Sequence, residues 1–143
     1  MRLGLCCKFQ EHPIRFRTTT ATVLLRMERQ AALEKVSQLC LANADALLQA
    51  LTFCRDNGIG AFRINSQILP VKTHPEAGYT VHDLPECRAI RQRFRACGVF
   101  ARANRIRTLF HPDQFVVLSS VDRGLISRSV NELRYQAEVA EWV

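Results

Sequence analysis

Two short apolar runs separated by one long helical stretch constrain the fold of this chain more than any other feature. The runs cover residues 2–6 and 59–64, and each has the length of a buried strand. Between them, from residue 28 to residue 56, apolar side chains recur every three or four positions, which predicts an amphipathic helix. A strand, a helix and a strand in this order form a right-handed parallel crossover. The sequence therefore predicts an α/β fold.

The same alternation continues toward the end of the chain. Apolar spacing predicts a second helix over residues 86–103, a third strand over 105–110 and a third helix from near Asp122 or Ser127. No Gly, Pro or basic residue closes that last helix. Its inward side should carry Ile126, Val130, Leu133, Ala137 and Ala140.

Three strand–helix units leave an open three-stranded parallel sheet. Parallel sheets are normally covered on both faces, so this one is small for its fold class. We therefore expect residues 1–143 to form a single partial domain, the amino-terminal part of a (β/α)8 TIM barrel that is truncated at its C-terminus. The alternative is a complete small α/β sandwich.

A histidine followed by proline comes after each of two neighbouring strands, at His74 and at His111. Proline stops regular strand pairing, so both histidines should lie on loops at the carboxyl edge of the sheet, where α/β proteins bind ligands. Imidazole binds Zn²⁺, Mn²⁺ and Fe²⁺ readily, and carboxylates, with Asp113 the nearest in sequence, would complete such a site. His74 and His111 are therefore candidate metal ligands, with a surface or hydrogen-bonding role as the alternative.

Gln114 and Phe115 follow the second of these histidines and allow two interpretations. An aromatic ring can stack where bases separate, and an amide can bond to base edges, so the pair is suited to entering a DNA duplex. Alternatively, Phe115 opens the apolar run 115–118 and packs inward, which the residue pattern by itself favours.

A formal net charge of +7 favours an anionic partner, with nucleic acid first among the candidates. Most of the excess is arginine, whose forked guanidinium suits phosphate. Arg15 and Arg17 flank Phe16 in the long aperiodic segment 8–22 and would hold phosphates around a stacked base. The alternative is a solvated loop with Phe16 in the core. The basic face of the 86–103 helix is most simply a solvated surface.

The cysteines give no sign of a disulfide framework or a zinc site, because no CxxC pair occurs. Cys6 and Cys7 are adjacent at the first apolar run, and most of the others fall on apolar helix faces. With no cleavable signal sequence and no long apolar span, the chain is expected to be cytoplasmic and not bound to a membrane, with reduced and mostly buried thiols.

Several motifs of this chain occur together in one known family. They are Arg2-Leu3-Gly4, the strand end Phe62-Arg63-Ile64-Asn65-Ser66 with Leu69-Pro70, Thr73-His74-Pro75, and the segment 110–118 that contains His111-Pro112-Asp113-Gln114-Phe115. Through them the chain resembles the ultraviolet DNA damage endonuclease family over nearly its whole length. That length corresponds to about the first half of a typical member.

The resemblance implies a (β/α)8 barrel related to endonuclease IV, with up to three divalent metals, usually manganese, at the carboxyl ends of the strands. Members nick double-stranded DNA immediately 5′ to ultraviolet photoproducts. By motif match, His74 and His111 would be metal ligands, and Gln114 and Phe115 would probe the damaged duplex, with Phe where Tyr is frequent. The resemblance assigns no catalytic residue beyond these.

Two departures from the family pattern lead to further expectations. Leu5 stands where many members carry Tyr, which affects the lesion pocket. The ligands that the family draws from later strands are absent because the chain stops at Val143, so we expect little nicking activity and weak metal affinity from these 143 residues alone. An open sheet edge also invites self-association.

Two other functions remain open at this point. A metal-dependent sugar isomerase or epimerase of the same barrel superfamily also carries ligands on strand ends, although the arginine excess counts mildly against it. A non-catalytic DNA-binding module needs no metal at all. Salt-sensitive affinity for duplex DNA separates the isomerase from the other two, because phosphate contacts release counterions.

Overall fold

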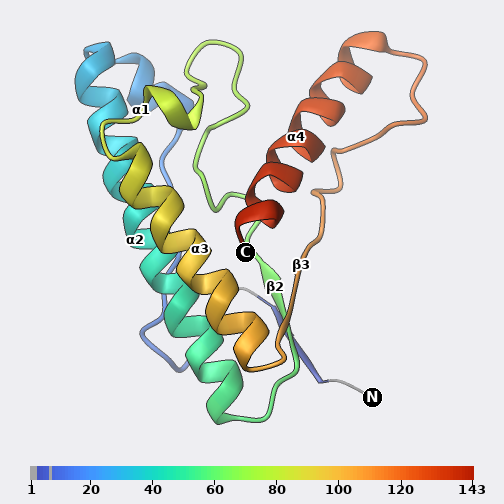
Figure 1. Cartoon of the computed structure of the whole chain (residues 1–143). Coiled ribbons are helices and arrows are strands. Elements are labelled where there is room, and N and C mark those ends of the chain that lie inside the picture. Colours follow the sequence, from blue (N-terminus) through green and yellow to red (C-terminus); the bar gives the residue numbers. More distant parts are fainter. Residues whose placement is uncertain (1–2, 7) are drawn as a thin grey trace.

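Three parallel strands form one sheet in the order β1–β2–β3 in a computed structural model, which describes residues 3–6 and 8–143 (Figure 1). The strands are β1 (Gly4–Cys6), β2 (Ala61–Ile64) and β3 (Arg107–Phe110). All three lie within the predicted runs, and their parallel pairing confirms the predicted crossovers. Arg2, the first residue of the first run, and Cys7, which follows that run, lie outside the described residues.

The long helices occupy the positions that apolar periodicity predicts. One short helix was not expected, because the sequence predicts a loop for residues 8–22. The Thr20 hydroxyl accepts a hydrogen bond from the amide of Val23 and starts this helix. The helical segments are α1 (Ala21–Leu25), α2 (Arg29–Asp56), the 3-10 turn η1 (Val81–Asp83), α3 (Cys87–Ala103) and α4 (Arg123–Trp142).

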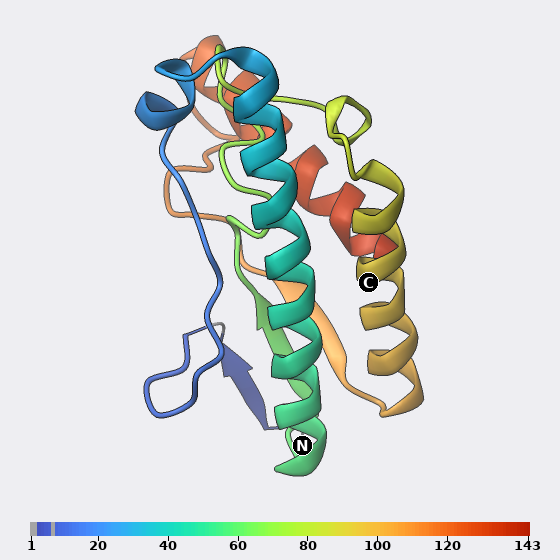
Figure 2. The same ribbon diagram turned by 90° about the vertical axis from the view of Figure 1, so that its left-hand side faces the viewer.

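The two faces of the sheet have different surroundings. Helices α2 and α3 lie side by side on one face, where Phe62 is 0% and Ile64 is 2% exposed (Figure 1, Figure 2). Leu5 and Phe110 of the neighbouring strands pack against the same core. On the opposite face, Cys6 and Arg63 are exposed. In the described part of the chain, only one face of the sheet is therefore covered by helices.

The buried side of α4 differs from the predicted stripe. Ala137 and Ala140 are exposed, because α4 packs on α3 through its last turns and on loop residues nearer its start. The Trp142 ring lies 6.1 Å from that of Phe94, and the Ser129 hydroxyl accepts a hydrogen bond from the amide of Val117. The residues that α4 buries are Ser129, Tyr135, Gln136, Val139 and Trp142.

Helix α3 holds the end of α4. Arg102 donates from Nη1 to the carbonyl oxygen of Val143 at 3.1 Å, and the guanidinium of Arg91 lies 5.7 Å from the centre of the Trp142 ring. A Cβ at Gly98 would lie 2.5 Å from the Val143 oxygen, so only glycine permits this approach. Arg91 and Arg102 of α3 therefore stabilise the fold. They place positive charge beside the carboxyl end of α4, whose last turn has no basic residue.

The helix cysteines belong to the core, as their positions on apolar faces predict. Burial raises the pKa of Cys40 and of Cys97 to about 12, and that of Cys54 to about 11, so these thiols stay protonated at neutral pH. Cys6 is exposed and carries no disulfide. Among the described helices, none is long and apolar enough to cross a membrane.

Candidate functional site

The loops that follow β2 and β3 meet at the carboxyl edge of the sheet, against the side of α4. The β2 loop runs through residues 65–80 and carries His74, and the β3 loop runs through residues 111–121 and begins with His111. Ile64 and Phe110 are register partners, so the two loops leave adjacent strands at the same level. The arrangement agrees with the expected placement of both histidines at this edge.

Buried side chains from α2 and α4 anchor the start of the β2 loop. Asn43 donates from Nδ2 to the carbonyl oxygen of Ile68 at 2.9 Å, and the Tyr135 hydroxyl accepts the N–H of Leu69 at 3.0 Å. The Tyr79 hydroxyl donates to the carbonyl oxygen of Pro70 at 3.0 Å. These bonds satisfy polar backbone groups that burial would otherwise leave without partners.

Burial also fixes the ionisation of the two phenols. It raises the pKa of Tyr79 and of Tyr135 well above the ordinary tyrosine value. Both hydroxyls therefore remain protonated and act as permanent hydrogen-bonding groups in the loop's support.

The far part of the β2 loop is held in a tight and strained conformation. Val71 has φ +62°, a left-handed conformation that is costly for a β-branched residue. Arg29 donates to the carbonyl oxygens of Ala77 and Gly78, at 3.3 and 2.7 Å. The amide of Gly78 bonds back to the carbonyl oxygen of His74 at 2.9 Å, which closes the loop around the histidine.

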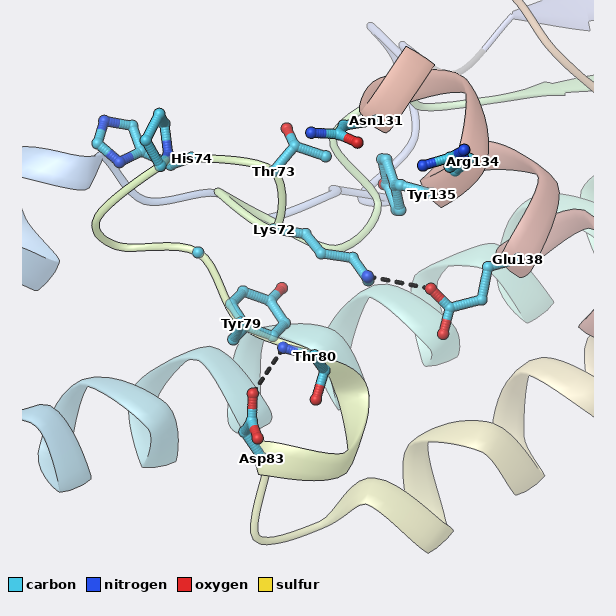
Figure 3. Close-up of a pocket in the computed structure, with 12 residues that line it drawn as sticks. Lys72, Thr73, His74, Tyr79, Thr80, Asp83, Asn131, Arg134, Tyr135 and Glu138 are labelled. Atoms are coloured by element: carbon cyan, nitrogen blue, oxygen red, sulfur yellow. Dashed lines mark hydrogen bonds and ion pairs between the residues drawn. The ribbon is translucent and has the colours of Figure 1, made fainter. Parts of the chain in front are cut away.

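A cavity of about 550 Å³ lies between the β2 loop and α4 (Figure 3). Lys72 reaches toward α4, where its Nζ is 3.0 Å from Oε2 of Glu138. Thr73 donates from its hydroxyl to Oε2 of Glu132 at 2.8 Å. Two polar links therefore join the loop to the helix, at a residue that precedes Tyr135 and a residue that follows it in the sequence of α4.

The ring of His74 is half-buried beside this cavity, and its hydrogen bonds define its tautomer. Nδ1 accepts the backbone N–H groups of Glu76 and Ala77, at 3.2 and 3.1 Å. The neutral ring therefore carries its hydrogen on Nε2. In this orientation Nε2 carries the ring's N–H, and the ring offers no free lone pair to a cation.

His111 is exposed directly after β3, and none of the described residues makes a hydrogen bond with its ring. Its imidazole can accept a cation without rearrangement. His74 can do so only after its ring turns and gives up the two amide contacts. Among the described residues, no three His, Cys, Asp or Glu side chains are grouped closely enough to hold a metal ion. The described residues therefore form no complete metal site.

The probing pair proposed from the sequence is on the surface. Phe115 is 73% exposed and Gln114 is exposed, so the inward packing of Phe115 that the residue pattern favoured is wrong. The cause is a turn in which Asp113 accepts the amide of Phe115 at its Oδ1 and that of Val116 at its carbonyl oxygen. This turn carries the aromatic ring away from the core.

A second cavity, of about 330 Å³, joins the two loops. It is lined by Thr73, the neighbour of His74, and by Asp113 and Phe115 of the β3 loop. Arg128 and Glu132 of α4 complete its polar wall. Of the predicted site residues, Phe115 lines this cavity and His74 lines the first one, while His111 and Gln114 line neither.

Arg15 and Arg17 are exposed, while Phe16 between them points toward the sheet, 6.5 Å from the Phe62 ring. The base-stacking interpretation of Phe16 is therefore not supported, and its packing interpretation is confirmed. The fully buried Asn43 fixes this segment, since it accepts the amide of Arg17 at 2.7 Å and donates to its carbonyl oxygen at 2.9 Å. Sequence reasoning missed Asn43, although a polar residue within the apolar stripe of a helix was a usable signal.

Comparison with known proteins gives a consistent result. The family model described as UV-endonuclease UvdE matches residues 1–143. A UV DNA damage endonuclease from Nostoc sp. is 31% identical over 136 residues, which are 94% of this chain and 41% of the relative. The enzyme of the same name from Halalkalibacterium halodurans is 32% identical over 120 residues, 83% of this chain and 36% of that protein.

The same similarity is found among solved structures. The crystal structure of SacUVDE superposes on 99% of this chain and 45% of its own, with a TM-score of 0.80 and 26% sequence identity. The chain therefore has the fold of that part of SacUVDE and spans less than half the length of these relatives.

Proposed function

Because the chain belongs to the UV-endonuclease UvdE family, we propose that it supplies the amino-terminal part of a DNA repair endonuclease that nicks DNA 5′ to ultraviolet photoproducts by metal-dependent phosphodiester hydrolysis. The observation that carries this proposal is the family match over all 143 residues. The convergence of the two histidine-bearing loops at one edge of the sheet supports it. Ligands commonly bind at this edge in parallel α/β folds.

His111 and His74 are the proposed ligands of a divalent cation, with Mn²⁺ the expected ion. A bound divalent cation supplies Lewis acidity toward the scissile phosphodiester. His111 contributes a free imidazole, and His74 joins after its ring has turned away from the amides of Glu76 and Ala77. Because no three potential ligands are grouped among the described residues, these 143 residues alone should bind the ion weakly and nick DNA little or not at all.

Gln114 and Phe115 are the proposed contacts to the damaged duplex. The Phe115 ring is exposed, so it can insert at a base step without being pulled out of the protein core. Asp113 fixes the turn that presents the ring. Phe115 lines the cavity of about 330 Å³ between the two loops, so there is open space beside the ring on the protein side.

Arg15 and Arg17 are the proposed phosphate contacts. Replacing either by Ala should lower the affinity of the chain for duplex DNA and reduce the slope of log affinity against log salt by about 1. Fluorescence anisotropy with labelled duplex over a salt series measures both quantities. Arg105→Ala, which removes the same charge before the amino end of β3, is the matched control and should leave the slope unchanged. Equal slopes for all three variants would contradict the assignment.

A further inference from the structure

Arg29, the first residue of α2, binds the backbone of the β2 loop at two neighbouring carbonyl groups. Its Nη1 lies 3.3 Å from the carbonyl oxygen of Ala77, and its Nη2 lies 2.7 Å from that of Gly78. The guanidinium is a rigid planar fork, so its two nitrogens hold the two oxygens at a fixed separation. A lysine ammonium has no such fork.

Each of these carbonyl groups shares a planar peptide unit with an N–H group that closes the loop. The first unit donates the N–H of Gly78 to the carbonyl oxygen of His74 at 2.9 Å. The second donates the N–H of Tyr79 to the carbonyl oxygen of Lys72 at 3.3 Å. Because the peptide unit is rigid, a contact that holds its oxygen also sets the direction of its N–H group. Arg29 therefore fixes both of these closing bonds.

The same turn supplies the amides that orient the His74 ring. Nδ1 of His74 accepts the N–H groups of Glu76 and Ala77. Ala77 thus bonds to the ring through its N–H group and to Arg29 through its carbonyl oxygen. A single residue of the turn connects the guanidinium to the imidazole.

Asp83 of η1 helps to keep the guanidinium at the loop. The amide of Thr80, 2.7 Å from Oδ2, is the main cause of the lowered pKa of Asp83, and the charge of Arg29 lowers that pKa further (Figure 3). Asp83 is therefore ionised at neutral pH and attracts Arg29. Among residues 3–6 and 8–143, no ion pair joins the two directly, so the carbonyl oxygens remain the contacts of the fork.

We propose that Arg29 is a positioning residue for His74, and that its fork on the carbonyl oxygens of Ala77 and Gly78 gives the imidazole a single orientation. Arg29 holds the carbonyl side of the turn and makes no contact with the ring, so the loop keeps its place when the ring turns toward a cation. An ordered loop loses less conformational entropy when the ring binds an ion. This consequence rests on the proposed role of His74 as a ligand, whereas the orientation of the ring does not.

NMR of the 143-residue chain tests the orientation directly. Long-range ¹H–¹⁵N correlation spectra, recorded where imidazole is neutral, show which ring nitrogen carries the hydrogen, and the spectrum of His74→Gln identifies this ring among the four histidines. We expect the Nε2–H tautomer alone in the unaltered chain and a mixture of both tautomers in Arg29→Ala. Hydrogen exchange at the amides of Gly78 and Tyr79 should become about tenfold faster in that variant.

Two further variants separate positioning from charge and from folding. Arg26→Ala removes the same charge from an exposed residue shortly before α2 and should leave the tautomer and both amides unchanged. Arg29→Lys keeps the charge without the fork and should protect at most one of the two amides. The Nε2–H tautomer alone in Arg29→Ala, full protection of both amides in Arg29→Lys, or equal losses in Arg26→Ala would each overturn the proposal.

Mn²⁺ added to the chain measures the consequence for ion binding without any nicking assay. The paramagnetic ion broadens the signals of a ring that it binds, and the Mn²⁺ concentration for half-broadening of the His74 signals should rise about threefold in Arg29→Ala. Broadening at the same concentration in both chains would overturn the proposal. No broadening of His74 in the unaltered chain would instead contradict its proposed role as a ligand, and the tautomer measurement would still decide the positioning role of Arg29.

Discussion

Gly78→Ala is expected to destabilise the chain by about 3 kcal/mol, because the new methyl group has no space. A Cβ at this position would lie 2.3 Å from the carbonyl oxygen of His74 and 2.7 Å from that of Lys72. Both contacts are with backbone, which cannot turn aside as a side chain can. The β2 loop must therefore open, and the Gly78 amide then loses its bond to His74.

Urea unfolding followed by circular dichroism measures this effect. Gly4→Ala is the matched control, since the nearest atom to its Cβ would be 3.7 Å away, an ordinary contact distance. The control should change the free energy of unfolding by less than about 1 kcal/mol. If Gly78→Ala were as stable as Gly4→Ala, the closed conformation of the β2 loop would be wrong.

Asn43→Ala should also cost about 3 kcal/mol, since it leaves one buried and two partly buried backbone groups without partners. The groups are the amide and carbonyl of Arg17 and the carbonyl of Ile68. Each of them belongs to a loop at the carboxyl edge of the sheet, so one substitution should loosen both the arginine segment and the histidine loop.

The same unfolding experiment checks Asn43→Ala, with hydrogen exchange at the amide of Arg17 as a local readout. Gln38→Ala is the control, because Gln38 is an exposed residue of the same helix and should contribute less than about 0.5 kcal/mol. Unchanged protection of the Arg17 amide in Asn43→Ala would show that the asparagine does not hold that segment.

Periodicity was sufficient to predict the strands, the long helices and the parallel sheet. Apolar spacing depends on local geometry, and α2 and α3 bury the faces that their spacing indicates, with Cys40 and Leu47 on one and Phe94 and Cys97 on the other. The His-Pro pairs also indicated the correct edge of the sheet, because proline ends strand pairing wherever it occurs.

Features that depend on distant contacts could not be predicted in this way. Ala137 and Ala140 continue the apolar stripe of α4 but are exposed, because the docking of Trp142 on α3 decides which side is buried. Phe115 begins an apolar run but is turned outward by a hydrogen bond to Asp113. The tautomer of His74 depends on a loop closure that no spacing indicates.

The most direct test of the endonuclease proposal is a plasmid-nicking assay on a fusion of this chain to the carboxyl-terminal part of the Nostoc relative. Irradiated and unirradiated plasmid are compared with and without Mn²⁺, alongside the His111→Ala variant and the 143-residue chain alone. We predict nicks that require irradiation, Mn²⁺ and His111, and little or no nicking by the chain alone. Nicking that persists in His111→Ala or without metal, or robust incision by the chain alone, would contradict the proposal.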